Sequence, residues 1–269
     1  MGFDVAGTTA LVTGASSGIG AAIAEGLAAR GATVAICARR TDRLTEVLER
    51  CQVHAPGSRM WTADLADLDA VTAFATTVDD EMGGIDLLVN NAGVPKRKMV
   101  AALRLDEVDD VMAINYLSPV RLILALLPRM QARGRGAIVN LGSVAARMSP
   151  PGEASYSASK AAITAFSEGL ATELWDSPLS VHVIHPGIIE TELFSQPDND
   201  ESIADDIEAL PASTVCDLMV ELLRTGTFEG YIPEWFTDIA SGKAANMQGY
   251  LSGAAEYFAV KMAERAARD

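Results

Sequence analysis

The chain has 269 residues and a formal net charge of -15, with 49% hydrophobic and 21% charged side chains. These proportions are ordinary for a globular domain and exclude a mainly disordered, collagen-like or fibrous protein. The length is sufficient for one α/β domain with a sizeable core, so we expect residues 1–269 to form a single domain.

The acidic excess is concentrated in the last third of the chain. Residues 191–269 carry five basic and fifteen acidic side chains. Such a surface repels nucleic acid and anionic lipid, so we expect neither as a partner. Solubility alone explains the same charge equally well.

Membrane spans, targeting signals and structural cysteines are not predicted. Apolar stretches such as residues 122–127 are shorter than the roughly 18 residues that a spanning helix needs. The N-terminus lacks the positive flank of a signal peptide. Cys37, Cys51 and Cys216 are an odd number at unrelated spacings, which indicates reduced thiols rather than disulfides or a metal site. We therefore expect a cytoplasmic protein without a bound metal.

Strand-like and helical segments alternate through the first two thirds of the chain. Strands are predicted at residues 9–13, 33–37, 60–61, 85–89, 137–141 and 181–184. Between them lie helical patterns at 19–30, 42–50, 67–82, a long segment ending near 131, and 154–175. This alternation predicts an α/β fold, a doubly wound parallel sheet with helices on both faces.

The regularity weakens after Pro186 and Gly187. Residues 188–211 are predicted to form a loop with one short helix, and 212–269 a more variable C-terminal region. Within that region we expect a helix at 218–223, a last strand at 228–232 and an amphipathic helix at 248–267.

A glycine-rich loop connects the first predicted strand to the first helix. Its sequence is Thr13-Gly14-Ala15-Ser16-Ser17-Gly18-Ile19-Gly20. Glycines let the backbone approach a pyrophosphate, whose charge is met by the N–H groups and dipole of the helix N-terminus. The spacing differs from the common G-x-G-x-x-G pattern, and a tight structural turn is the alternative.

Two arginines follow the second predicted strand. Many folds that bind NAD place an acid here to accept a hydrogen bond from the ribose 2′-hydroxyl, whereas this chain has Arg39 and Arg40. A guanidinium suits a 2′-phosphate through paired, charge-assisted hydrogen bonds. We therefore predict NADP(H) rather than NAD(H), with Arg39 as the main contact; two solvated arginines at a helix start are the alternative.

A phenol and an ammonium lie four residues apart in one predicted helix. Tyr156 and Lys160 therefore share a helix face, although such a pair alone is often only a helix surface. A nearby positive charge stabilises phenolate, so we expect Lys160 to lower the pKa of Tyr156 toward that of a working acid or base. Ser143 follows the strand at 137–141, at the sheet edge where ligands bind, and is placed to polarise a carbonyl.

Taken together, these motifs resemble those of the short-chain dehydrogenases/reductases over residues 6–192, which implies a Rossmann-like fold. The matching features, in order, are the Thr13 to Gly20 loop, Asp64-Leu65, Asn90-Asn91-Ala92-Gly93, Asn115, Ser143, Tyr156 with Lys160, and Pro186-Gly187 with Thr191. The joint pattern outweighs the structural alternative for each motif alone.

The resemblance implies roles for four catalytic residues. Tyr156 would be the proton donor or acceptor, and Ser143 would polarise the same substrate oxygen. Lys160 would bind the nicotinamide ribose and lower the pKa of Tyr156, while Asn115 would hold a water-linked proton relay. Hydride would pass directly between nicotinamide and substrate carbon.

The resemblance also implies a cofactor site and a homodimer or homotetramer. Asp64 and Leu65 would flank the adenine, Asn91 would support the cofactor side of the sheet, and Ile188 and Thr191 would meet the carboxamide. The expected cofactor-binding residues are Gly14, Ser16, Ser17, Gly18, Ile19, Gly20, Arg39, Arg40, Asp64, Leu65, Asn91, Ala92, Gly93, Tyr156, Lys160, Pro186, Gly187, Ile188 and Thr191.

The C-terminal third departs from the ketoreductases of fatty-acid synthesis. The loop after Pro186 carries Asp198, Asp200, Glu201, Asp205, Asp206 and Glu208 without a basic residue. A lid of that charge disfavours anionic substrates, so we expect a neutral, hydrophobic ketone or secondary alcohol. The alternatives are a 3-oxoacyl-thioester reductase, a catalytically silent NADP(H)-binding sensor, and a peripheral membrane enzyme attached through its tail helix.

Overall fold

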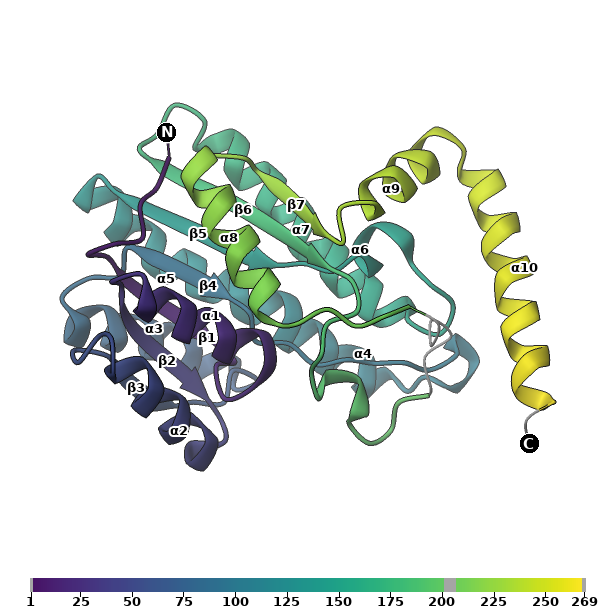
Figure 1. Cartoon of the computed structure of the whole chain (residues 1–269), viewed down its shortest axis with the longest axis horizontal. Helices are drawn as coiled ribbons and strands as arrows, with labels where there is room; N and C mark the ends of the chain where they lie inside the picture. Colours follow the sequence, from purple (N-terminus) through teal and green to yellow (C-terminus); the bar gives the residue numbers. More distant parts are fainter. Residues whose placement is uncertain (1, 201–206, 268–269) are drawn as a thin grey trace.

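A computed structural model describes residues 2–200 and 207–267, and its centre is one seven-stranded parallel sheet. The strand order is β3-β2-β1-β4-β5-β6-β7 (Figure 1). The strands are β1 (Thr9–Thr13), β2 (Thr33–Ala38), β3 (Arg59–Thr62), β4 (Leu87–Asn90), β5 (Gly136–Leu141), β6 (Leu179–Pro186) and β7 (Glu229–Ile232). The chain order reverses between β1 and β4, which opens a crevice at the carboxyl ends of the strands.

Helices cover both faces of the sheet, as predicted. One hydrophobic cluster joins the sheet to α1, α2 and α8, and a second joins its other face to α3, α5 and α7. The bounds are α1 (Gly18–Ala29), α2 (Thr41–Gln52), α3 (Leu68–Met82), α4 (Leu105–Met112), α5 (Ser118–Arg133), α6 (Ala145–Met148), α7 (Ala154–Glu173), α8 (Ser213–Thr225), α9 (Phe236–Ala245) and α10 (Met247–Ala266). Shorter helical turns are η1 (Val100–Ala102), the π-helical η2 (Ala113–Leu117) and η3 (Leu193–Ser195).

The central strands are apolar on both sides because both of their faces are covered. Successive side chains of a strand point to opposite faces. In β1, Val12 belongs to the cluster with α1 and α8, whereas Leu11 belongs to the cluster with α3 and α5. These central strands therefore need a continuous hydrophobic run rather than an alternating one. Packing of that run on both faces holds the polar ends of the strands in register.

The prediction that no helix is long and apolar enough to span a membrane needs correction. Helices α4, η2 and α5 join into one run of 29 residues, Leu105–Arg133, whose most apolar 18-residue window has a mean hydropathy of 1.6. By length and composition it meets the requirement for a span. Its inward side chains, among them Leu122, Ile123 and Leu126, are fully buried in the core against α3 and the sheet.

The C-terminal region is only partly packed on the body. The predicted tail helix is present as α10, which stands away from the sheet in Figure 1. None of its described residues is buried, and Met247 and Leu251 are about half exposed at 50% and 53%. The acidic residues Glu201, Asp205 and Asp206 of the predicted substrate lid lie outside the described residues.

Candidate active site

A cavity of about 500 Å³ opens at the carboxyl edge of the sheet. All the predicted cofactor-binding residues line it, and so does Ser143. They come from the loops after β1, β2, β3, β4, β5 and β6, from the first turn of α1, and from α7. Residues separated by more than 170 positions in the chain thus meet at the crevice that the strand order creates.

The glycine loop presents an open helix N-terminus to this cavity. In the described part of the chain, no side chain caps the first turn of α1, and that turn contains no acidic residue. Gly14 has a φ of 68°, and a Cβ there would lie 2.8 Å from the Ala92 Cα, so only glycine fits. Asn91 Nδ2 donates to the Thr13 carbonyl at 2.8 Å and fixes the loop. These features fit the pyrophosphate of a dinucleotide.

Arg39 and Arg40 lie beside the loop and line the same cavity. The Arg40 Nη2 donates to Ser17 Oγ at 2.6 Å and to Ser16 Oγ at 3.1 Å. Arg39 is exposed and forms no hydrogen bond or ion pair with another described residue, so its donors are available to a ligand. Two guanidinium groups thus flank the position expected for the adenine ribose, and the donor set fits a 2′-phosphate.

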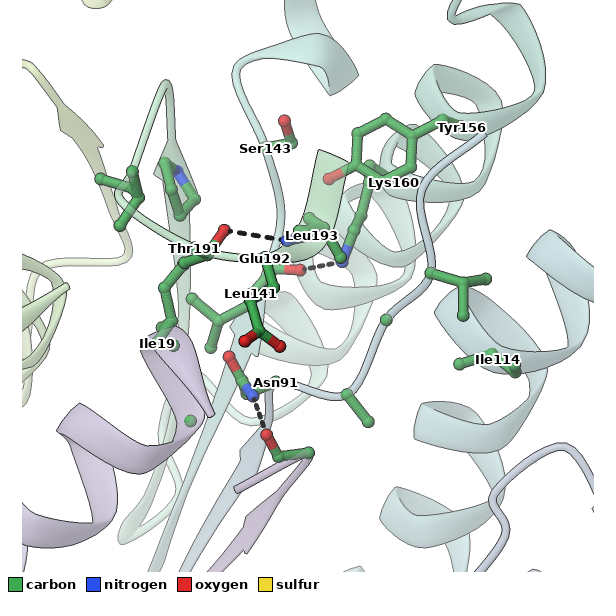
Figure 2. A pocket seen from close by; sticks show the side chains of 18 of the residues that line it. Ile19, Asn91, Ile114, Leu141, Ser143, Tyr156, Lys160, Thr191, Glu192 and Leu193 are labelled. Atoms are coloured by element: carbon green, nitrogen blue, oxygen red, sulfur yellow. Dashed lines mark hydrogen bonds between the residues drawn. The ribbon is translucent and has the colours of Figure 1, made fainter. Parts of the chain in front are cut away.

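Ser143, Tyr156 and Lys160 converge on the inner end of the cavity (Figure 2). Tyr156 and Lys160 share one face of α7 and are 4% and 5% exposed. Lys160 Nζ donates to the Leu141 carbonyl at 2.8 Å and lies 6.0 Å from the centre of the Tyr156 ring. Ser143, in the loop after β5, lies near the Tyr156 phenol and lowers its pKa. The residues chosen as proton donor, polarising hydroxyl and cation therefore lie together.

The expected lowering of the Tyr156 pKa is not found in this structure. Burial, followed by the negative charge of Glu153, raises the pKa of the phenol above its ordinary value, and the hydrogen bond with Ser143 only partly opposes this rise. Burial also lowers the pKa of Lys160 to about 8. The prediction was wrong because spacing along a helix does not reveal how far burial removes both groups from water.

Asn115 lies behind the cavity wall rather than in it. Its side chain is 1% exposed; Oδ1 accepts from the Val94 N–H at 2.8 Å, and Nδ2 donates to Ser159 Oγ at 3.0 Å. Asn115 belongs to the π-helical turn η2, a distortion common at functional sites. It therefore connects the chain after β4 to helix α7, next to Lys160.

One ion pair in the cavity was not predicted from the sequence. Arg97 Nε donates to Glu153 Oε1 at 2.8 Å, and both side chains are about nine-tenths buried, at 10% and 12% exposure. Both line the cavity beside Tyr156. The partners are 56 positions apart, so no local pattern links them, although an acid three residues before Tyr156 was the available signal.

Replacement of Glu153 by Gln is expected to shift the pH profile of catalysis toward lower pH. The Glu153 charge contributes to the raised pKa of Tyr156, so its removal lowers that pKa. For alcohol oxidation, which needs phenolate, the rise of kcat/KM with pH then begins at a lower pH. Glu173→Gln, at the exposed far end of α7, is the matched control. An unchanged profile for Glu153→Gln would show that this charge does not act on Tyr156.

A second connection that the sequence did not reveal supports the Ser143 loop. His185, at the end of β6, is completely buried; its Nδ1 lies 3.1 Å from the Ser143 carbonyl oxygen and its Nε2 lies 3.2 Å from Glu229 Oε2. Arg147 Nη2 donates to the same carboxylate oxygen at 3.1 Å. The histidine therefore supports the backbone at Ser143, one of the predicted catalytic residues.

The fold and this site together define a class of protein. An open helix N-terminus, two arginines beside it, and a tyrosine beside a serine and a lysine are features of a dinucleotide-dependent oxidoreductase. The family model for short chain dehydrogenases matches residues 8–202. The chain therefore belongs to the short-chain dehydrogenase/reductase family and is an oxidoreductase of CH–OH groups with NAD(P) as acceptor.

Similar proteins within the family differ in substrate. The chain is 34% identical to the 3-oxoacyl-(acyl-carrier-protein) reductase FabG of Vibrio harveyi over 80% of this chain and 86% of that protein. It is 36% identical to gluconate 5-dehydrogenase of Gluconobacter oxydans over 76% of this chain and 79% of that protein. A short chain dehydrogenase from Burkholderia cenocepacia, solved in complex with NADP, aligns with a TM-score of 0.79 and 30% identity over 94% and 99% of the two chains.

Proposed function

We propose that this enzyme transfers hydride between NADP(H) and a neutral, largely apolar ketone or secondary alcohol. The observation that carries the proposal is the position of Tyr156, Ser143 and Lys160 in a cavity whose remaining wall is mostly apolar. The apolar lining away from the glycine loop includes Val94, Met148, Pro150, Ile189, Leu193, Ile207 and Phe236.

The buried tyrosine acts as the proton donor in the reductive direction. A phenol with a raised pKa stays protonated at neutral pH, and Tyr156 is able to donate to a carbonyl oxygen that Ser143 also holds. NADPH, when bound, supplies the hydride. Lys160 places a donor beside the phenol, and Asn115 keeps helix α7 attached to the chain after β4. In oxidation, Tyr156 instead accepts the proton of the alcohol.

The preference for NADP(H) rests on charge at the adenine end of the cavity. Arg39 and Arg40 both line this end of the cavity. An acid at the same position would instead suit the unphosphorylated ribose of NAD(H). Paired, charge-assisted hydrogen bonds to a phosphate are stronger than those between neutral groups. Arg39, whose donors have no partner among the described residues, remains our candidate for the main contact.

The preference for a neutral substrate rests on charge at the substrate end. Arg97 and Lys160 are the basic side chains that line that part of the described cavity; Glu153 neutralises Arg97, and Lys160 donates to the Leu141 carbonyl. Asp198, Asp200 and Glu208 are exposed on the following loop segment. An anionic substrate would therefore be repelled on approach and would find its nearest cation already paired.

Paired thioesters provide the test of this substrate class. With NADPH at low salt, we expect kcat/KM for the N-acetylcysteamine thioester of a 3-oxo acid to exceed that for the matching coenzyme A thioester by roughly 10-fold, because only the latter carries phosphates. The difference should shrink as salt is added. Faster turnover of the coenzyme A thioester would favour the alternative, a 3-oxoacyl-thioester reductase, which the FabG relatives support.

We also propose a homodimer or homotetramer in a reducing compartment such as the cytoplasm. Helices α4 and α5 expose Leu105 and Leu124, at 76% and 61%, on the side away from the sheet, and a second copy would cover them. Cys37, Cys51 and Cys216 are free and buried, which suits a reducing compartment.

A further inference from the structure

A short segment after β6 is tied to the opposite side of the cofactor cavity. We call residues 190–193 the strap. Its Glu192 Oε2 accepts a hydrogen bond from Arg43 Nη1 at 2.6 Å and another from Arg40 Nη1 at 3.2 Å. The same Arg40 contacts the glycine-loop hydroxyls of Ser16 and Ser17. The Glu192 carboxylate therefore already binds Arg40 beside the phosphate-binding loop.

This ion pair crosses the edge of the sheet. β2, which precedes Arg40, and β6, which precedes the strap, are separated by β1, β4 and β5. Neighbouring strands lie about 4.8 Å apart, so the two strand ends are separated by roughly 20 Å. The chain from the end of β6 to Glu192 covers that distance together with the Glu192 and arginine side chains. The strap also touches the loop, since a Cβ at Gly18 would lie 2.9 Å from Thr191 Cγ2. Figure 2 shows Thr191 and Glu192 projecting into the cavity from the strap.

The chemistry of this contact matches that of a bound phosphate. Carboxylate and phosphate oxygens accept the same forked hydrogen bonds from a guanidinium. The pKa of the Glu192 carboxyl is lowered by the hydrogen bond from Arg43 and then by that from Arg40, so it is an anion at neutral pH. All three side chains are 41–60% exposed, so the contact is solvated, screened by salt and readily exchanged.

We propose that Glu192 is an internal competitor for the 2′-phosphate. It holds Arg40 while the cavity is empty of that phosphate and releases Arg40 when NADP(H) binds. The strap thereby sets the affinity for NADP(H) relative to NAD(H), because a cofactor without the 2′-phosphate does not compete for Arg40. This inference rests on the NADP(H) preference proposed above.

Replacement of Glu192 by Gln tests the inference through cofactor binding alone. Titration calorimetry at low salt should give an affinity for NADPH that is on the order of 3-fold higher than in the wild type, since an exposed ion pair of this kind contributes little. The NADH affinity should not change, and the gain should diminish at high salt. Glu190→Gln is the matched control, because Glu190 is exposed on the same strap and forms no ion pair with a described residue.

The possible results separate this inference from the proposed function. A wild type that prefers NADPH, combined with a Glu192→Gln variant of equal or weaker NADPH affinity, would overturn the inference and leave the cofactor preference standing. A gain of equal size for NADH would also overturn it. If the wild type binds NADH and NADPH equally, the proposed preference fails and the competitor role fails with it.

Discussion

Replacement of Tyr156 by Phe is expected to lower kcat for ketone reduction by about 100-fold to 10,000-fold, the usual contribution of a positioned acid. The substitution removes only the phenolic hydroxyl, which lies near Ser143. Because Tyr156 is 4% exposed and its ring packs beside Lys160, phenylalanine fills the same space and the fold should persist. The rate of NADPH consumption with a ketone that the wild type reduces gives kcat, and calorimetry gives the cofactor affinity.

A second tyrosine provides the control for this substitution. Tyr116 lies in η2, with its ring 6.4 Å from that of Phe166, and it does not line the cavity. Tyr116→Phe should therefore keep nearly full activity, while Tyr156→Phe keeps its NADPH affinity and loses turnover. Substantial turnover by Tyr156→Phe would exclude this phenol as the proton donor. A parallel loss of cofactor binding would instead indicate a structural role.

Replacement of Arg39 by Ala is expected to raise the Kd for NADPH by about 10-fold to 100-fold, the range for a lost charged hydrogen bond. The Kd for NADH should stay within about 2-fold, because its ribose carries no phosphate for the guanidinium to bind. Arg40→Ala should produce a smaller loss, because in the wild type Arg40 must first release Glu192. Fluorescence titration of each of the two variants with each of the two cofactors measures these four dissociation constants, which are compared with the wild-type values.

An arginine near the C-terminal end of α2 controls for the loss of positive charge. Arg50 pairs with Glu25 at the far end of that helix and does not line the cavity. Arg50→Ala should leave both cofactor affinities unchanged. Equal weakening of NADH and NADPH in Arg39→Ala would show that Arg39 supports the site without recognising the 2′-phosphate. No weakening in either Arg39→Ala or Arg40→Ala would contradict the proposed cofactor preference.

Local patterns predicted the fold because the relevant physics is local. Apolar runs such as residues 137–139 of β5 predict strands covered on both faces, and the four-residue spacing of Tyr156 and Lys160 predicts a shared helix face. The strand order then brings the strand ends to one edge. The apolar character of the run Leu105–Arg133 was underestimated because only its uninterrupted apolar stretch, residues 122–127, was compared with the length of a span.

The electrostatics of the site was beyond the reach of the sequence. The Arg97–Glu153 pair and the Arg40–Glu192 pair join residues 56 and 152 positions apart, so no periodicity relates them. The direction of the Tyr156 pKa shift depends on how completely the phenol is buried and on the nearby Glu153. Both are properties of packing, and they follow from the sequence only through the complete fold.

Transfer of deuterium from NADPH deuterated at nicotinamide C4 tests the central claim most directly. The purified enzyme is incubated with each member of a panel of aliphatic, aromatic and steroid ketones, and the product alcohols are analysed by mass spectrometry. We predict deuterium on the carbinol carbon of at least one product with the wild type, and none above background with Tyr156→Phe. Tight NADPH binding without transfer to any ketone, by wild type and variant alike, would contradict the account and favour a catalytically silent sensor.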